Sequence, residues 1–527
     1  MVYRTSAGGS FSPRLLPPHH WQEGVWGLGL FCGALLLLSL NLGTIPLYHG
    51  SEVTLAQIAR EIVAAPEGSW RWLYPAVAED ATVRMPPLWP NVVAAVYQLL
   101  GVNAWTTRLP GAVLGAFSVW GVYKVGREVF HSHPPAVLAA LSYLTLSPLL
   151  MTGRWAVLET VGVVGMILTV YSVLRSRRDL RWGLAVGFGI GACFLTQGFW
   201  GLSVVMLVVL FLLWDTPRLL SSFYLWWGLG LGMLPVGGWY LAQGLQSSTR
   251  QFMTLVLAHL QPTPGPSLSF LLVVFLLPGL LLGGDSLRLA QHHCHWSWAK
   301  LVWVWSGVGL LGVLLSVTQA GVSLLPLFPP LSLAIGAQLA EIGQLPGDRA
   351  YPTRLWVGLL SLAFVTVGCM AFFAFRQPLQ LTMPLILGAI ALTLAITALL
   401  IAQRETHFPV LLFWGMYVAA LLFVSSPHWM PTPPIAQLIK PMAAMLQVTT
   451  PSQAVIYTPL AQGEQALQFY SQRSLEQATL PQLQQQWNTQ DHPYLLLDYE
   501  TLQQLSPQNP QVLGRVTAYG VLITKPV

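Results

Sequence analysis

Thirteen apolar runs, each close to the length that crosses the hydrocarbon core of a bilayer, dominate this sequence. A membrane-spanning helix needs about 20 mostly apolar residues. Charged residues make up only 8% of the 527 residues, against about 25% in an ordinary soluble domain, which excludes a soluble globular fold, a disordered chain and a coiled coil. The sequence therefore predicts an all-α polytopic membrane protein with about thirteen spans. They are 26–46, 106–124, 134–152, 156–174, 182–199, 200–214, 221–243, 267–283, 301–318, 321–340, 355–375, 380–402 and 408–426.

The distribution of Lys and Arg residues among the loops orients these spans. If residues 1–25 form a cytoplasmic tail, the tail and the cytoplasmic loops hold fourteen Lys and Arg residues, and the outer loops before residue 427 hold seven. Membrane proteins carry such an excess in their cytoplasmic loops. We therefore expect a multi-pass protein of the plasma (inner) membrane with a cytoplasmic N-terminus. An odd number of spans places the C-terminal region outside.

Two stretches between or after the apolar runs are too long to be simple turns, and both fall outside. The first, residues 46–105, lies within a transmembrane domain predicted over 26–426. The second, residues 427–527, is polar and Gln-rich, and alternating strand and helix patterns predict a small extracytoplasmic α/β domain. Its strand-like runs are 454–458, 494–499 and 516–524, and its helical patterns are 463–472 and 479–488.

The first outer loop begins with an amphipathic helix. Leu55, Ile58 and Ile62 fall on one face at helical spacing, as in a helix that lies on a membrane interface. Ser51 is placed to cap its N-terminus, and Glu52 falls in the first turn, where the helix dipole favours an anion. This capping role is the structural alternative to any catalytic role for the two residues.

Several short motifs, in this order along the chain, resemble the GT-C membrane glycosyltransferases. The resemblance covers residues 26–340 and is closest to the bacterial group of protein O-mannosyltransferases and the lipid A aminoarabinose transferase, of glycosyltransferase family 39 type. It implies an inverting hexosyl- or pentosyltransferase that moves a sugar from a polyprenyl-phosphate donor to a lipid, glycan or protein acceptor on the outer face. The motifs are SEVTLAQIAREI, RMPPLW, RLPGAVLGAF, VYKVGREVF, LSPLLMTGRWAVLET, FLTQGFWG and LLPLFPPLSLAIG.

At four polar positions the sequence departs from the pattern of this family. The Asp-Glu pair that opens the loop helix is Ser51-Glu52 here, and the Lys before Pro-Pro is Met85. The Asp expected near the outer end of a later span is Glu159, and the Lys of a T-K-G turn is Gln197. Only the change from Asp to Glu keeps the charge and the role.

The chemistry implied by the resemblance needs a base for the acceptor hydroxyl and a stabiliser for the departing phosphate. Because Ser51 cannot replace the carboxylate of the family, we expect Glu52 to be the catalytic carboxylate. His49 and Glu159 are the next candidates for the base.

Three outer arginines are candidates for binding the donor phosphate. Arg108 and Arg154 match family positions at the outer ends of spans, and Arg84 directly precedes Met85. Each could instead reach lipid headgroups, and Arg154 could simply pair with Glu159. We expect the candidate residues to share a cavity that opens to the outer face, with an apolar lateral entrance for the polyprenyl chain.

No cofactor is expected, and a divalent cation is not indicated. The four cysteines are far apart in sequence, which argues against a disulfide framework and a four-cysteine metal site. The four adjacent side chains of His292 to His295 are hard to bring around one tetrahedral ion. No basic run is long enough to follow a nucleic-acid backbone. The expected partners are therefore the polyprenyl-phosphate-linked sugar, a lipid or glycan acceptor and membrane lipids.

Two other functions stay open at this point. A relative that has lost catalysis could bind lipid carriers or assist another transferase. A transporter should show two similar halves and broken spans near the bilayer midplane, and the sequence contains no internal repeat.

Overall fold

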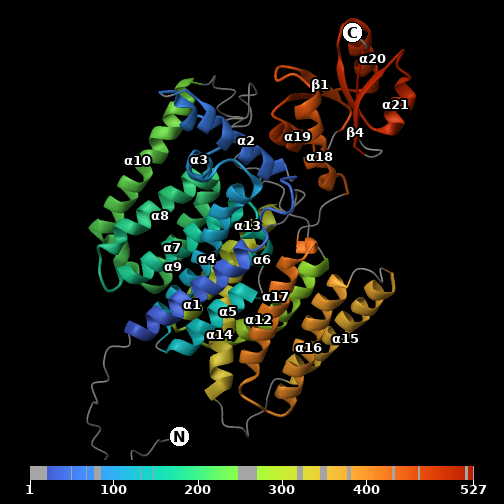
Figure 1. The fold of residues 1–527 in the computed structure, drawn as a ribbon. Coiled ribbons are helices and arrows are strands. Elements are labelled where there is room, and N and C mark those ends of the chain that lie inside the picture. The colour runs from blue at the N-terminus through green and yellow to red at the C-terminus, as the bar shows by residue number, and fades with distance from the viewer. Residues whose placement is uncertain are drawn as a thin grey trace, which may run out of the picture.

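A bundle of long helices carries a small domain of strands and helices at one end, which we call the domain end (Figure 1). The first helix, α1 (His20–Ser39), starts at the opposite end of the bundle. The computed structural model describes residues 20–48, 50–66, 68–75, 85–130, 132–145, 148–246, 270–316, 324–344, 353–376, 381–429, 434–460, 463–516 and 520–525.

Each predicted apolar run overlaps at least one helix of the bundle. The run predicted over 134–152 is broken, because α5 ends at Thr145 and Pro148 precedes the short helix α6 (Leu149–Thr152), as expected where proline interrupts a helix. The other long helices are α4 (Ala104–Val129), α5 (His133–Thr145), α7 (Leu158–Ser176), α8 (Trp182–Gln197), α9 (Gly201–Asp215), α10 (Phe223–Gln246), α12 (Phe270–His292), α13 (Ser297–Ser316), α14 (Phe328–Gln344), α15 (Thr353–Arg376), α16 (Thr382–Ala402) and α17 (Phe408–Ser425). Short 3-10 helices are η2 (Gly198–Trp200), η3 (Pro217–Ser221), η4 (Leu325–Leu327) and η5 (Pro427–Trp429).

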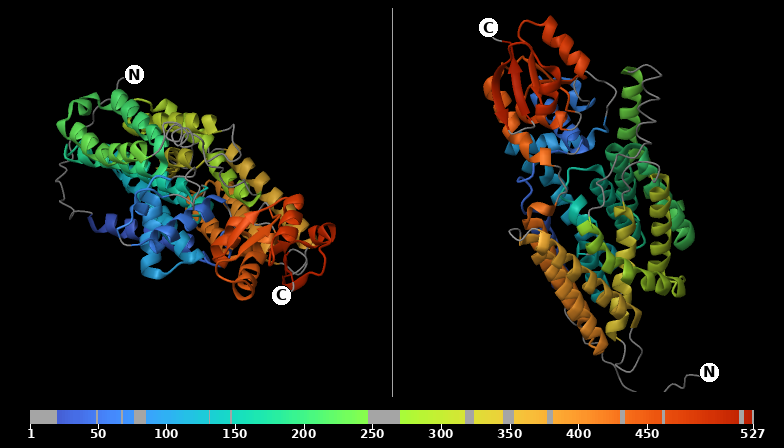
Figure 2. Two further views of the ribbon diagram at one scale, coloured as in Figure 1. Left: turned by 90° about the horizontal axis from the view of Figure 1, so that it is seen from above. Right: turned by 90° about the vertical axis from the view of Figure 1, so that its right-hand side faces the viewer.

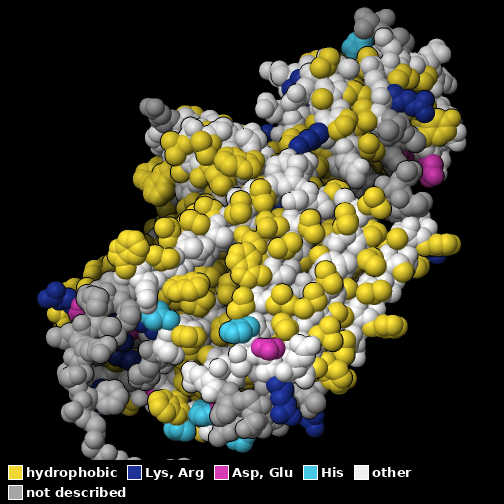
Figure 3. Space-filling view, turned by 60° about the horizontal axis from the view of Figure 1, so that its bottom comes forward, with side chains coloured by type: hydrophobic (Ala, Val, Ile, Leu, Met, Phe, Trp, Pro, Cys, Tyr) yellow, Lys and Arg dark blue, Asp and Glu magenta, His cyan; other side chains and the backbone are white. Residues whose placement is uncertain are grey.

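The bundle has the surface of a multi-pass membrane protein. Within the described residues, eight helical segments are long and apolar enough to cross a bilayer, the combined α8–α9 stretch counting as one of them. In the view of Figure 3, charged and histidine side chains gather at the end opposite the domain and on the domain itself, and hydrophobic side chains cover much of the surface between. The all-α membrane fold is therefore confirmed, whereas the number of thirteen spans stays a prediction.

The two least easily divided runs, between residues 182 and 214, form two antiparallel helices. The Gln197 side chain at the end of α8 donates to the Leu158 carbonyl at the start of α7 (3.1 Å). The Asp215 carboxylate at the end of α9 pairs with Arg177, just beyond the other end of α7 (2.6 Å). The chain reverses at Gly198, whose φ of 61° suits a residue without a side chain.

The small domain is a five-stranded sheet in the order β2-β1-β3-β5-β4. Strand β1 runs parallel to β2 and β3, and β5 runs antiparallel to β3 and β4. The strand predicted over 516–524 is found as β5 over residues 520–524, but its predicted start is wrong, because Val516 ends β4 and pairs with Gly520. The elements are α18 (Pro434–Thr449), β1 (Val455–Thr458), α19 (Glu464–Ser471), β2 (Ser474–Gln477), α20 (Leu480–Thr489), β3 (Tyr494–Leu497), α21 (Tyr499–Leu505), β4 (Gln511–Val516) and β5 (Gly520–Thr524).

The first outer loop supplies the layer between the bundle and the small domain. It contains α2 (Gly50–Ala64), η1 (Trp70–Trp72) and α3 (Leu88–Leu100), and Figure 2 shows α2 and α3 beside the domain in both views. Val53 and Ala56 of α2 belong to a buried cluster with α18 and α19. Leu55 and Ala59 belong to a different cluster, with α3. Helix α2 is therefore buried on two faces, one toward the domain and one toward the bundle.

Candidate functional site

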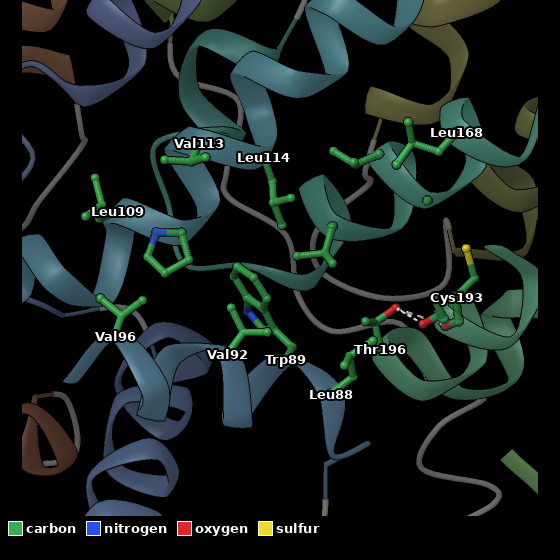
Figure 4. Close-up of a pocket in the computed structure, with 15 residues that line it drawn as sticks. Leu88, Trp89, Val92, Val96, Leu109, Val113, Leu114, Leu168, Cys193 and Thr196 are labelled. Atoms are coloured by element: carbon green, nitrogen blue, oxygen red, sulfur yellow. Dashed lines mark hydrogen bonds between the residues drawn. The ribbon is translucent and has the colours of Figure 1, made fainter. Parts of the chain in front are cut away.

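An apolar groove of about 470 Å³ runs between α3, α4, α7 and α8 (Figure 4). Its size lies within the usual range of small-molecule sites, about 300–1,000 Å³. The one hydroxyl among its lining residues, that of Thr196, donates to the carbonyls of Ala192 and Cys193 and so is already satisfied. Leu88 and Val92 line the groove and are each 37% exposed, so the groove reaches the surface at α3. The apolar lining of the groove suits a hydrocarbon chain.

A second, much smaller cavity lies at the start of α7, and we call it the carboxylate pocket. Its volume of about 20 Å³ is enough for roughly one water molecule. The Glu159 Oε2 atom is buried and has no hydrogen-bond partner among the described residues. A buried acceptor without a partner is costly, so Glu159 is the group here with capacity left to bind something else. The lining residues are Ser51, Leu55, Met85, Ala156, Val157, Leu158 and Glu159.

The groove and the carboxylate pocket adjoin along two segments of the chain. On α7, Glu159 lines the pocket and Val161, two residues later, lines the groove. Met85 lines the pocket, and Leu88, three residues later, lines the groove. A molecule whose apolar tail lies in the groove would therefore have its polar end near Glu159, although the pocket itself holds no more than about one small polar group.

The four positions that depart from the family pattern come together at this pocket. Ser51, Met85 and Glu159 line it. Gln197 lies next to it, since its amide donates to the Leu158 carbonyl. Ser51 lies inside the first turn of α2 and not at the predicted N-cap position, because the helix already begins at Gly50.

Glu52 faces away from the carboxylate pocket and forms a buried ion pair with Arg108. Its two carboxylate oxygens accept from Arg108 Nε and Nη2 at 2.7 and 2.8 Å, and Oε1 also accepts from the Ala156 backbone N–H at 3.2 Å. The side chains of Glu52 and Arg108 are 1% and 0% exposed. Such a bidentate pair is strong and specific in geometry, so Glu52 is held in place as an ion.

All five N–H groups of Arg108 are used inside the protein. Two go to Glu52, and the others reach the carbonyls of Leu42 and Ile45, both at 2.7 Å, and of Pro46 at 3.3 Å. A guanidinium group has five donors and no acceptor. Arg108 could bind a phosphate only by giving up one of these bonds.

Arg154 holds the end of α1. Its Nη1 donates to the carbonyls of Leu37 and Leu38, at 2.9 and 3.4 Å, and Nη2 donates to the Leu40 carbonyl at 2.6 Å. A cation at a helix C-terminus is favoured by the dipole and satisfies the last carbonyls. The suggested pair with Glu159 is wrong, because these bonds direct the guanidinium to α1 and no ion pair joins the two residues in the described part of the chain.

Trp429 is a functional candidate that the sequence analysis missed. Its fully buried ring lies 4.3 Å from the Arg154 Cζ atom and 5.5 Å from the Arg108 Cζ atom. The faces of indole rings attract guanidinium groups. Trp429 directly follows the last apolar run, but nothing in the sequence connects it with arginines about 300 residues earlier.

Several predicted residues lie outside the described part of the chain. His49 and Arg84 belong to this group, and their predicted roles stay untested. No group of three or more His, Cys, Asp or Glu side chains suited to a metal ion occurs where side chains are described.

The bundle, the outer-loop helices and the appended sheet domain form a fold that is similar to known membrane transferases, and one segment of the chain matches a family model. Residues 84–240 match the family described as dolichyl-phosphate-mannose-protein mannosyltransferase. The predicted resemblance to the GT-C group is therefore confirmed.

Two crystal structures of ArnT from Cupriavidus metallidurans are similar over nearly the whole chain. The apo structure has a TM-score of 0.71 and 16% identity and covers 95% of this chain and 98% of ArnT. The structure bound to undecaprenyl phosphate has a TM-score of 0.73 at the same identity, covering 96% and 98%. At this identity the similarity establishes the fold.

Curated relatives are similar over part of their length. Undecaprenyl phosphate-alpha-4-amino-4-deoxy-L-arabinose arabinosyl transferase of Pectobacterium atrosepticum is 24% identical over 364 residues, which are 63% of this chain and 63% of the relative. The corresponding transferase of Aeromonas salmonicida is 24% identical over 376 residues, 65% of each chain. The matched region thus spans less than two thirds of these relatives.

Proposed function

We propose that this protein is an integral-membrane glycosyltransferase that transfers a sugar from a polyprenyl-phosphate donor to a lipid or glycan acceptor. The observation that carries the proposal is the apolar groove, which adjoins a carboxylate with one buried oxygen that has no hydrogen-bond partner among the described residues. The apolar lining of the groove is suited to a polyprenyl tail. The Glu159 carboxylate could act as the base that the reaction needs. The names of the relatives and the ArnT structure with undecaprenyl phosphate support the same donor class.

We propose that the domain end faces the outside of the plasma (inner) membrane and that the N-terminus is cytoplasmic. Arg175, Arg177 and Lys300 lie at the opposite end, around the Asp215 carboxylate and the end of α7. An excess of basic residues marks the cytoplasmic side. Cysteine labelling from outside at Gln484 tests this orientation, and labelling only after the membrane is opened would overturn it.

In this proposal Glu159, and not Glu52, takes the proton of the acceptor. The carboxylate accepts the hydroxyl proton while the acceptor oxygen forms a bond to the anomeric carbon of the sugar. The bond from that carbon to the phosphate oxygen breaks, and its electron pair leaves with the polyprenyl phosphate, so the configuration inverts. Glu159 has a free carboxylate oxygen, whereas both oxygens of Glu52 are held by Arg108.

Arg84 is the arginine that we propose for the departing phosphate. It lies outside the described residues, but its neighbour Met85 lines the carboxylate pocket. The donors of Arg108 are already engaged, and Arg154 is directed to α1. Arg84→Ala should raise the donor KM or lower kcat, whereas Arg71→Ala, which removes a half-exposed arginine paired with Glu61, should not. Equal effects of the two substitutions would contradict this role.

The decisive experiment incubates the purified protein with a panel of labelled polyprenyl-phosphate sugars and membrane acceptors. Transfer by the wild type and its loss in Glu159→Gln would support the proposal. A second candidate function is the binding of lipid carriers without transfer. One observation favours it: in the described structure Glu159 is the only ionisable side chain that lines the pocket, so no second charged group lines it to assist a reaction. Binding of polyprenyl phosphate without transfer from any donor would establish that second function.

A further inference from the structure

The C-terminal domain holds α2 at both ends through the last turn of α19. The backbone N–H of Leu47, just before α2, donates to the Tyr470 hydroxyl at 2.9 Å. Arg60, in the second half of α2, donates from Nη1 to the Phe469 carbonyl at 2.7 Å. The Arg60 guanidinium also lies 5.2 Å from the centre of the Phe469 ring. Two adjacent residues of the domain thus fix the start and the far half of one helix.

The domain and α2 also share one hydrophobic core. Leu47, Val53 and Ala56 pack in the same buried cluster as Ile439 of α18 and Leu467 of α19. These side chains are all nearly inaccessible to solvent. Burial of this kind is close-packed, so a displacement on one side is transmitted to the other. The domain therefore packs directly against α2 through a shared hydrophobic core.

The opposite face of α2 forms part of the carboxylate pocket. Leu55 and Ser51 line that pocket together with Glu159. Helix α2 is consequently a rigid layer with the domain on one side and the proposed base on the other. A shift of α2 would change the distance between Ser51 and Glu159 directly, whereas the apolar groove, to whose lining α2 contributes no residue, would be affected only through α3.

We propose that the C-terminal domain positions α2 for the transfer reaction and that Tyr470 is the positioning residue. This inference rests on the proposed glycosyltransferase function. Tyr470 contacts neither the groove nor the carboxylate pocket, so it acts through Leu47 and α2. Burial raises the pKa of its phenol to about 12, and the hydroxyl therefore stays protonated at physiological pH.

Tyr470→Phe removes the hydroxyl and keeps the ring, and Tyr457→Phe is its matched control. Tyr457 lies in the same domain, and its hydroxyl accepts a hydrogen bond from Gln490 at 3.1 Å, but it packs on the other side of the sheet, away from α2. A general loss of domain stability should appear in both variants. A loss of α2 position should appear only in Tyr470→Phe.

The first measurement needs no enzymatic activity. Ser51→Cys is introduced into a variant in which the four native cysteines are replaced, and the rate of its thiol labelling is compared in the Tyr470→Phe and Tyr457→Phe backgrounds. Loss of the bond to Leu47 should change the rate by roughly three- to tenfold, because one hydrogen bond contributes about that factor to a local opening equilibrium. Tyr457→Phe should leave the rate unchanged. Equal rates in all backgrounds would overturn the proposal.

The second measurement is transfer kinetics with the labelled donor panel. Tyr470→Phe should lower kcat by about tenfold or more, since misplacing a reacting group by a fraction of an ångström is costly. The donor KM should change much less than kcat, because α2 lines the carboxylate pocket and not the groove. Unchanged kcat in Tyr470→Phe overturns the positioning role even if transfer occurs. Absence of transfer by the wild type overturns the glycosyltransferase function, while the labelling result still decides the positioning role.

Discussion

Two carboxylates lie on either side of Ala156, and their surroundings differ sharply. Glu52 accepts the Ala156 N–H and has both oxygens held by Arg108. Glu159 lines a water-sized pocket beside the same alanine, with one oxygen unpartnered. The first carboxylate belongs to a closed network that fixes the chain between α1 and α2, and the second has capacity left to take part in a reaction. The two carboxylates therefore differ in how many of their oxygens are already bound by the protein, and this difference underlies the proposed role of Glu159.

The largest effect should come from breaking the closed network. Arg108→Gln leaves Glu52 buried without its counter-ion, and removal of one member of a buried pair costs about 3–5 kcal/mol. We expect a large fall in the thermal unfolding midpoint of the purified protein. The double variant Glu52→Gln with Arg108→Gln should recover part of that loss, since it leaves no unpaired charge. If the double variant is less stable by the sum of the two single effects, the two residues are not coupled.

Glu159→Gln tests the other carboxylate. It should lower kcat by at least about a hundredfold, because a positioned general base contributes about 10²–10⁴ in rate. Its thermal midpoint should stay near that of the wild type, because no ion pair is lost. Glu52→Gln should show the reverse pattern, with a large loss of stability. A Glu159→Gln enzyme of full activity would return the role of base to Glu52 or His49.

A bulky side chain in the groove should weaken binding of the donor and leave the fold intact. Ala192 lines the groove and is half-buried, so Ala192→Phe places a ring where the tail would lie. We expect kcat/KM for the donor to fall by about tenfold, equivalent to about 1.4 kcal/mol of lost binding. Ala185→Phe, at a half-buried position of the same helix that does not line the groove, is the control. Similar losses in both variants would show that helix packing, and not the groove, was disturbed.

The smallest effect on activity should come from Trp429→Phe. Phenylalanine keeps an aromatic face under the two guanidinium groups but attracts them less strongly than indole does. We expect about 1–2 kcal/mol of lost stability and a kcat within about twofold of the wild type. A drop in kcat much larger than the loss of stability would mean that the arginines take a direct part in transfer.

The membrane fold could be predicted from the sequence because apolar runs of about 20 residues form few structures other than membrane-spanning helices. The outer-loop helix is predicted by periodicity, and strands β1 and β3 of the sheet are predicted by alternation. Strand β2 (Ser474–Gln477) is missed, since three of its four residues are polar and exposed at the edge of the sheet. Thus local pattern determines most elements, and it fails where a strand has only one buried side chain.

The site is predicted in part. The resemblance singled out Ser51, Met85, Glu159 and Gln197 as altered positions, and the structure brings these four together. Of the residues predicted to share one cavity, Glu159 lines the carboxylate pocket, whereas Glu52, Arg108 and Arg154 do not. The roles of Glu52 and the arginines could not be read in the same way. Arg108 lies 56 residues from Glu52, and the carbonyls that bind Arg154 carry no side-chain signal in the sequence. Whether a charge is already satisfied depends on such tertiary partners.

The core shared by α2 and the C-terminal domain has a consequence for biosynthesis. Helix α2 precedes the C-terminal domain in synthesis, yet one of its faces packs against α18 and α19, which follow almost 400 residues later in the chain. A nascent protein interrupted before α18 would present Val53 and Ala56 to water at the membrane surface. The last part of the chain to be synthesised therefore completes the packing around the first outer loop, and a prematurely terminated chain lacks the support that holds α2 beside Glu159.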